Sequence, residues 1–359
     1  MPISAVDSIS PAFQHAKRQL LQPFRFGQWA RLAFVGLLAG ELSSGGGCNF
    51  QMPQLPRNTG GSGHFLAPNF PFPSVNPMLV AGLIALLVVA GLALWILLLY
   101  VNSVMRFVLF DSVVEKECHI RRGWSRRQGP GFRYFVWRIV IFLGALAGMV
   151  ILVGIPAAFA LAVGWLKNPG QHILPLVLGG IVLFFFFFAF LIGLLLLEVL
   201  SKDFMVPQMA LENISAFEAW RRLWAMMKQE KGGYAGYLGM KVVMAIGAAI
   251  TVGIVAVILM IVLLIPVGGF GMVAVLAGKA AGLTWNAYTI TLIVVAGSVV
   301  VAGILYLFSL ISVPVIVFFP AYSIYFFAAR YPALAAVLYP APPSAPQAPP
   351  LPPQPQPIG

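Results

Sequence analysis

The side chains that carry most acid–base and metal chemistry are scarce in this sequence. Its 359 residues include 10 Asp and Glu residues and 4 His residues. None of the histidines has a second metal ligand at helical or zinc-finger spacing, and the sequence contains no phosphate-binding loop, nucleophile elbow or dinucleotide fingerprint. We therefore expect a protein that is not an enzyme and that holds no catalytic residue, metal or cofactor.

Two of the acids, Glu41 and Glu198, fall near the ends of long apolar runs. A carboxylate at membrane depth is costly and often marks a proton or ion site. A carboxylate within a turn or two of a helix end can instead extend to the polar interface. We favour the second interpretation for both residues and keep the first as the alternative.

Basic residues dominate the charge and follow a pattern. The chain has 22 Lys and Arg residues and a net charge of +12, and the basic residues gather in every second gap between the apolar runs. Of the 22, only Arg57, Lys167 and Lys279 lie in the other gaps. Basic residues near span ends stay on the cytoplasmic side, so the basic gaps should lie inside. Charge that is spread over several membrane-flanking segments does not indicate binding of nucleic acid.

The basic clusters also suggest a binding partner. Positive charge at the inner headgroup level attracts anionic phospholipid by about 1 kcal/mol per residue. Ordinary anchoring of the spans is the favoured interpretation, and headgroup binding is the alternative. The candidate lipid contacts are Lys17, Arg18, Arg121, Arg122, Arg126, Arg127, Arg221 and Arg222. The aromatic residues expected at the same interface are Phe13, Trp29, Trp124, Phe217, Trp220 and Trp224.

Long apolar runs must position these residues. A bilayer core about 30 Å thick needs roughly 20 apolar residues of helix. The runs cover approximately 27–43, 78–100, 134–165, 173–197, 237–265 and 290–319. The first is marginal because Arg31 and Glu41 cut into its ends, but without it the basic N-terminal residues would lie outside. The sequence therefore predicts six spans with both termini in the cytoplasm.

The sequence also contains a repeat that is longer than the alternation of basic and other gaps. The segment PAFQHAKRQLL from Pro11 matches SAFEAWRRLWA from Ser215, and a related basic segment follows Phe107. Each precedes a pair of apolar runs. The pattern predicts an all-α membrane protein of three units, each an interfacial amphipathic helix followed by a transmembrane hairpin. Ser10 and Ser215 are the expected N-caps of the first and third helices, and glycines and Pro130 should shorten the middle helix.

The remaining segments flank or interrupt the membrane domain that these three units form. Residues 1–9 form a polar leader without the apolar core of a signal peptide. The membrane domain is expected to cover 10–331. The external loop 43–77 and the proline-rich tail 332–359, which carries no charged residue, have the composition of disordered segments.

Finally, the chain resembles a known group of proteins. A turn with Val206, Pro207, Leu211 and Glu212, the basic helix from Ser215 and a Gly/Tyr-led span are similar to poorly characterised six-span membrane proteins of bacteria and archaea. That group includes the membrane domain attached to some glycerophosphoryl diester phosphodiesterases. The resemblance implies a helical module in a prokaryotic inner membrane. We expect it to organise the envelope or to bind lipid, with a transporter or lipid-translocating protein as the alternative.

Overall fold

The computed structural model describes residues 4–41, 77–166, 169–280, 282 and 287–340. Every regular element in these ranges is helical. In chain order they are α1 (Ile9–Leu21), α2 (Phe26–Leu38), α4 (Pro77–Val114), α5 (Ile120–Met149), the π-helix η1 (Val150–Gly154), α6 (Ile155–Ala162), the 3₁₀-helix η2 (Pro169–Gln171), α7 (Ile173–Leu200), the π-helix η3 (Ser201–Met205), α8 (Val206–Glu212), α9 (Ala216–Gln229), α10 (Lys231–Ala280), α11 (Ala287–Ala328) and α12 (Pro332–Leu338).

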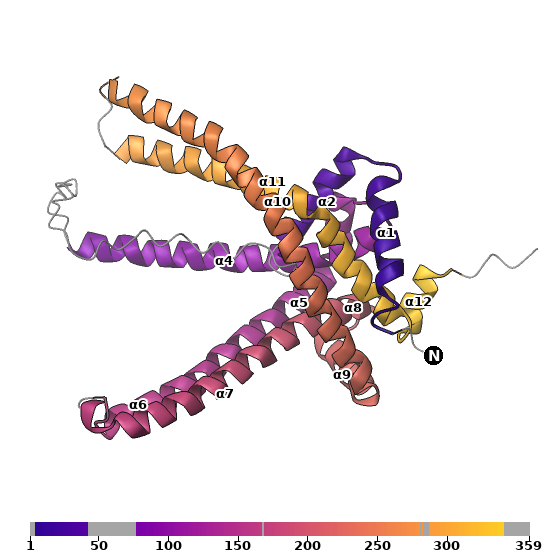
Figure 1. The fold of residues 1–359 in the computed structure, drawn as a ribbon, viewed down its shortest axis with the longest axis horizontal. Helices are drawn as coiled ribbons and strands as arrows, with labels where there is room; N and C mark the ends of the chain where they lie inside the picture. Colours follow the sequence, from indigo (N-terminus) through magenta and orange to yellow (C-terminus); the bar gives the residue numbers. More distant parts are fainter. Residues whose placement is uncertain (1–3, 42–76, 167–168, 281, 283–286, 341–359) are drawn as a thin grey trace, which may run out of the picture.

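The helices form three arms that extend from one junction (Figure 1). One arm is α4, the second pairs α5 and α6 with α7, and the third pairs α10 with α11. The shorter helices α1, α2, α8, α9 and α12 gather at the junction, and the arms point away from it. The molecule therefore has a compact end and an end made of one long helix and two separate apolar hairpins.

Within the described residues, five helices are long and apolar enough to cross a membrane. They cover Ile84–Val114, Ile120–Ala162, Ile173–Glu212, Lys231–Leu263 and Tyr288–Ala328. Large apolar side chains along the arms point outward, for example Phe185, which is 65% exposed, and Val294, which is 62% exposed. Apolar surface of this extent is unfavourable in water and favourable in lipid, where helices satisfy their own backbone groups. The fold is thus an all-helical one with multi-pass membrane character.

The first expected span, 27–43, corresponds to the short helix α2. Its 13 residues extend only about 20 Å, which is less than the hydrocarbon core. Gln28 near its start donates to the Lys116 carbonyl, and Leu38 at its end accepts from Asn102. Helix α2 therefore lies beside the part of α4 near the junction. Asn102, which contacts the end of α2, is about 38 Å along α4 from the start of that helix at Pro77. Residues 42–76, which include all but the last residue of the expected disordered loop, lie outside the described residues.

The core lies at the junction, where aromatic rings pack across elements distant in sequence. Phe204, Tyr237, Tyr322 and Phe326 are all fully buried. The ring of Tyr237 lies 4.6 Å from that of Phe326, and it stacks on Tyr322 at 5.0 Å. Such ring pairs stabilise a fold beyond the area they bury. This cluster joins η3, α10 and α11 at the root of two arms.

The sequence led us to expect a shortened helix in the basic segment after residue 119, and this prediction is wrong. Instead α5 runs without a break from Ile120 through Pro130 to Met149. Its glycines permit close packing on α4: a Cβ on Gly131 would lie 2.7 Å from Val104 Cγ2, and one on Gly123 would lie 3.1 Å from Val108. Tertiary packing here outweighs the low helix propensity of glycine.

Helix boundaries differ from expectation at two places. Helix α1 begins at Ile9 with Ser8 in the N-cap position, so Ser10 lies inside the helix. Helix α12 covers the first residues of the expected tail, and its Leu334 is fully buried. The domain therefore extends to residue 338, because an apolar turn there packs on the junction. Residues 341–359 lie outside the described part of the chain.

Candidate functional site

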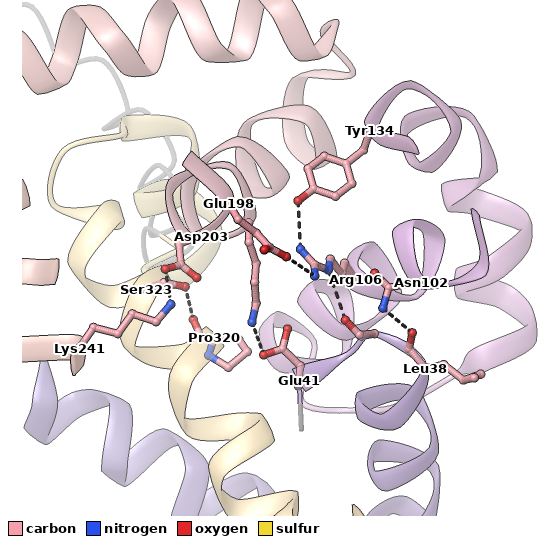
Figure 2. A network of polar contacts seen from close by, with 12 residues as sticks. Leu38, Glu41, Asn102, Arg106, Tyr134, Glu198, Asp203, Lys241, Pro320 and Ser323 are labelled. Carbon is pink, nitrogen blue, oxygen red and sulfur yellow. Dashed lines mark hydrogen bonds and ion pairs between the residues drawn. The ribbon is translucent and has the colours of Figure 1, made fainter. Parts of the chain in front are cut away.

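Charged side chains, most of them buried, gather where the arms meet, and we call this group the hub. Its acids are Glu41, Glu198 and Asp203, and its bases are Arg106, Arg138, Lys202 and Lys241. Figure 2 shows Arg106 directed toward Glu198 and Lys241 directed toward Asp203, each from a different helix. Lys202 pairs with Glu41, and Lys241 pairs with Asp203, whose carboxylate also accepts from the Tyr237 hydroxyl at 2.9 Å. The hub thus links α2 and α10 to the same turn of the second arm.

That turn is the π-helix η3, and its position follows from the sequence. It ends two residues before Pro207, just as the other π-helix, η1, ends two residues before Pro156. A proline supplies no N–H to the helical ladder, so the hydrogen-bond pattern must adjust around it. In η3 the adjusted turn directs Lys202 and Asp203 to different partners. Proline chemistry therefore helps to set the geometry of the hub.

Arg106 on α4 contacts several elements at once. It donates to the Tyr134 hydroxyl at 3.1 Å and to the Ala39 carbonyl at 3.3 Å. Its guanidinium also lies 3.5 Å from Glu198, which is 3.6 Å from Arg138. A buried guanidinium is stable only when several acceptors surround it, and these contacts supply them. Arg106 therefore fastens the end of α2 and the second arm to α4.

The hub leaves little free space. A cavity of about 30 Å³ lies among Glu41, Arg106, Lys202, Asp203 and Ser323. A cavity of this size holds about one water molecule. The two acids singled out from the sequence are both in the hub: the Glu41 side chain is 3% exposed, and the Glu198 side chain is 52% exposed. Both make ion pairs with bases that the sequence pattern had assigned to the cytoplasmic surface.

Another buried ion pair lies outside the hub. Arg127 on α5 makes two hydrogen bonds of 2.6 Å to the Asp111 carboxylate on α4 and a third, also of 2.6 Å, to the Ala210 carbonyl on α8. Arg127 was a candidate lipid contact, but its side chain is only 8% exposed. The guanidinium is therefore occupied inside the protein.

The other candidate lipid contacts differ in their surroundings. Arg221 and Arg222 on α9 pair with Glu218, and Arg222 also pairs with Glu212. Within the described residues Lys17, Arg18, Arg121 and Arg122 have no acidic partner, whereas Arg126 pairs with Glu115 at 3.3 Å. The structure thus separates arginines whose charge is neutralised locally from cations whose charge is not.

The expected interfacial aromatics also fall into two groups. Phe13, Phe217 and Trp224 are at least half exposed. Trp29, Trp124 and Trp220 are partly buried: Trp29 donates to the Leu310 carbonyl at 2.9 Å, Trp124 packs on Tyr100, and Trp220 packs on Trp137. Ser215 caps α9 as expected, accepting from the Glu218 N–H at 3.3 Å. The exposed group therefore lies on α1 and α9.

Comparison with known families gives one match. A family of unknown function, DUF7544, matches residues 3–337. The chain belongs to this family. No curated protein and no solved structure matches the chain. Within the described residues no group of three or more His, Cys, Asp or Glu side chains could hold a metal ion.

Most residues of the hub were not predicted from the sequence as functional residues. Lys202, Asp203 and Lys241 each stand within a few residues of an apolar run, where the positive-inside pattern accounts for basic residues without any partner. Their pairing joins positions far apart in the chain, such as Glu41 and Lys202. The nearest available signal was the pair of acids at membrane depth, which require partners when they are buried.

Proposed function

We propose that this protein is a non-enzymatic integral membrane module that binds anionic phospholipid through the surface at its junction. In this proposal the chain crosses a prokaryotic cell membrane six times as three hairpins, with both termini in the cytoplasm. The similarity to membrane domains attached to glycerophosphoryl diester phosphodiesterases belongs to the same proposal. It implies a supporting module in the membrane and not an activity.

The observation that carries the proposal is the pairing of exposed aromatics with unneutralised cations at the junction. On α1, Phe13 is 62% exposed, and Lys17 and Arg18 on the same helix are exposed without an acidic partner in the described chain. On α9, Phe217 and Trp224 are exposed, and the Lys228 ammonium lies 5.7 Å from the Trp224 ring. Aromatic and basic side chains together are typical of helices that lie in the headgroup layer.

The arrangement of the arms supports the same orientation. Helices α1 and α9 lie at the end of the molecule from which the apolar arms extend (Figure 1). If the arms occupy the hydrocarbon layer, these helices reach the headgroups on one side.

Lipid analysis tests the proposal directly. The full-length protein would be purified in mild detergent, and its retained lipids would be compared by mass spectrometry with those of the membrane from which it came. We expect anionic phospholipids to be enriched in the retained fraction. An unchanged anionic fraction would refute lipid binding, and a reporter fused after Arg330 that proved external would refute the cytoplasmic C-terminus.

The hub favours one alternative function. Buried ionisable groups at the meeting point of membrane helices can form a pathway for protons or solutes. Against this, the hub groups pair with one another around a cavity of only about 30 Å³. Reconstituted protein that moved labelled phospholipid, protons or a panel of solutes faster than empty liposomes would favour the alternative.

A further inference from the structure

A basic groove lies between the start of α2 and the start of α5. It is lined by Arg31 from α2 and by His119, Ile120, Arg121, Arg122, Ser125 and Arg126 from the other side, and it encloses about 820 Å³. We call it the arginine groove. A second hollow of about 240 Å³ shares Arg31 and His119 with it and extends along Arg25 and Gly27. The groove is therefore formed by two segments far apart in the sequence.

The four arginines that line the groove outnumber the two acids paired with groove residues. Glu115 pairs with Arg126 at 3.3 Å, and Glu117 lies 3.1 Å from His119. Arg31, Arg121 and Arg122 are exposed and make no ion pair within the described part of the chain. Cys118 adds no negative charge, because burial raises the pKa of its thiol. Three guanidinium groups consequently share one concave surface without an ion pair in the described residues, although Glu117 lines adjoining hollows with Arg31 and Arg122.

The backbone adds donors to the same surface. The first-turn N–H groups of a helix have no acceptor within that helix, and they carry a partial positive charge. Helix α5 begins at Ile120, in the wall of the groove, and no side chain caps it. Helix α2 begins at Phe26, beside the adjoining hollow, and is also uncapped by a side chain. The Gln28 amide donates to the Lys116 carbonyl at 2.6 Å, which holds the two walls together.

We propose that the arginine groove binds a phosphate group, carried by a phospholipid headgroup or free in solution. Guanidinium forks donate two parallel hydrogen bonds to phosphate oxygens, and unsatisfied helix N–H groups favour the same anion. A lipid is the source that the surroundings favour, because Phe24 and Phe26, which flank Arg25 of the adjoining hollow, are 58% and 64% exposed. This inference rests on the proposed function and deepens it, since it assigns the headgroup to one site.

A matched pair of variants tests the inference. The groove variant carries Arg31→Gln, Arg121→Gln and Arg122→Gln. The control variant carries Arg133→Gln, Arg221→Gln and Lys231→Gln, which remove the same charge from exposed cations that lie outside the groove and outside the α1 surface. Retention of an anionic phospholipid and of phosphatidylcholine by each delipidated full-length protein would be followed by native mass spectrometry. The rise in melting temperature with inorganic phosphate would be measured in parallel.

We expect the groove variant to lose anionic lipid at least about tenfold more strongly than the control, with little change in retention of phosphatidylcholine. The substituted side chains are exposed, so the melting temperature without ligand should match that of wild type. The single variant Arg122→Gln should already weaken retention by about fivefold.

The outcomes separate the two proposals. Equal losses in the groove and control variants would overturn the groove site and leave general anionic-lipid binding intact. Stabilisation by inorganic phosphate in wild type but not in the groove variant, without any lipid preference, would support a site for free phosphate and refute the proposed lipid function. No difference between the variants in either measurement would overturn the inference.

Discussion

Replacing Asp111 with Asn should destabilise the protein strongly, because it removes the charge that faces Arg127. The Arg127 side chain is 8% exposed, and both of its hydrogen bonds to Asp111 measure 2.6 Å. The amide keeps the shape of the carboxylate but leaves a buried guanidinium without a counter-charge. Breaking such a pair typically costs about 3–5 kcal/mol, so we expect a fall of this order in the free energy of unfolding.

Two further variants isolate the cause. Glu115→Gln breaks the pair between Glu115 and Arg126, whose side chains are 52% and 59% exposed, and it should cost no more than about 1 kcal/mol. The double variant Asp111→Leu with Arg127→Met removes both buried charges. It should recover most of the lost stability, because apolar groups of similar volume can replace a buried ion pair.

Unfolding by sodium dodecyl sulfate in mixed micelles, followed by tryptophan fluorescence, would give these free energies. The double-mutant cycle would then give the coupling between the two side chains. The reasoning fails if Asp111→Asn costs no more than Glu115→Gln. It also fails if the double variant is as unstable as the single one, since the cost would then not come from an unpaired charge.

Two other predictions concern packing and pH. Gly131→Ala should destabilise the protein by about 1–3 kcal/mol, because the new Cβ would lie 2.7 Å from Val104 Cγ2 and 3.0 Å from Val104 Cα. Gly129→Ala on the same helix should be neutral or stabilising, because its Cβ would have nothing within 4 Å. Thermal unfolding of both variants checks this contrast. Burial lowers the pKa of His15 below its ordinary 6.5, and the neutral ring bonds the Val113 carbonyl at 2.8 Å and the Tyr325 hydroxyl at 3.1 Å. The unfolded chain therefore binds the proton more readily, so the melting temperature should fall as pH drops below about 6.5, and His15→Gln should reduce that dependence.

The long helices could be predicted because their signal is local. A run of apolar residues long enough to cross a bilayer dictates a helix whatever surrounds it, and five such helices are present in the described chain. The cap of α9 is equally local, since Ser215 acts through the backbone three residues away. Features that depend on nearby residues alone were therefore accessible from the sequence.

Features that depend on tertiary packing were not accessible in the same way. Gly123 and Pro130 predict a broken helix when they are considered alone, yet α5 continues through both because α4 packs against it. Arg126 and Arg127 are adjacent, and both were predicted from the sequence as candidate lipid contacts. One lies inside and the other outside because a helix turns by about 100° at each residue, and only the fold decides which face meets Asp111.

The burial of some basic residues narrows where the protein can meet anionic lipid. Arg106, Arg127 and Lys241 neutralise acids within the fold, and the arginines of α9 are paired with Glu212 and Glu218. Many of the cations without an acidic partner in the described residues lie on α1, on or just before α2, and at the start of α5. They are Lys17, Arg18, Arg25, Arg31, Arg121 and Arg122. A charge pattern that is similar in every basic gap thus becomes an asymmetric surface after folding. Contact with anionic headgroups should therefore depend more on the first two basic segments than on the third.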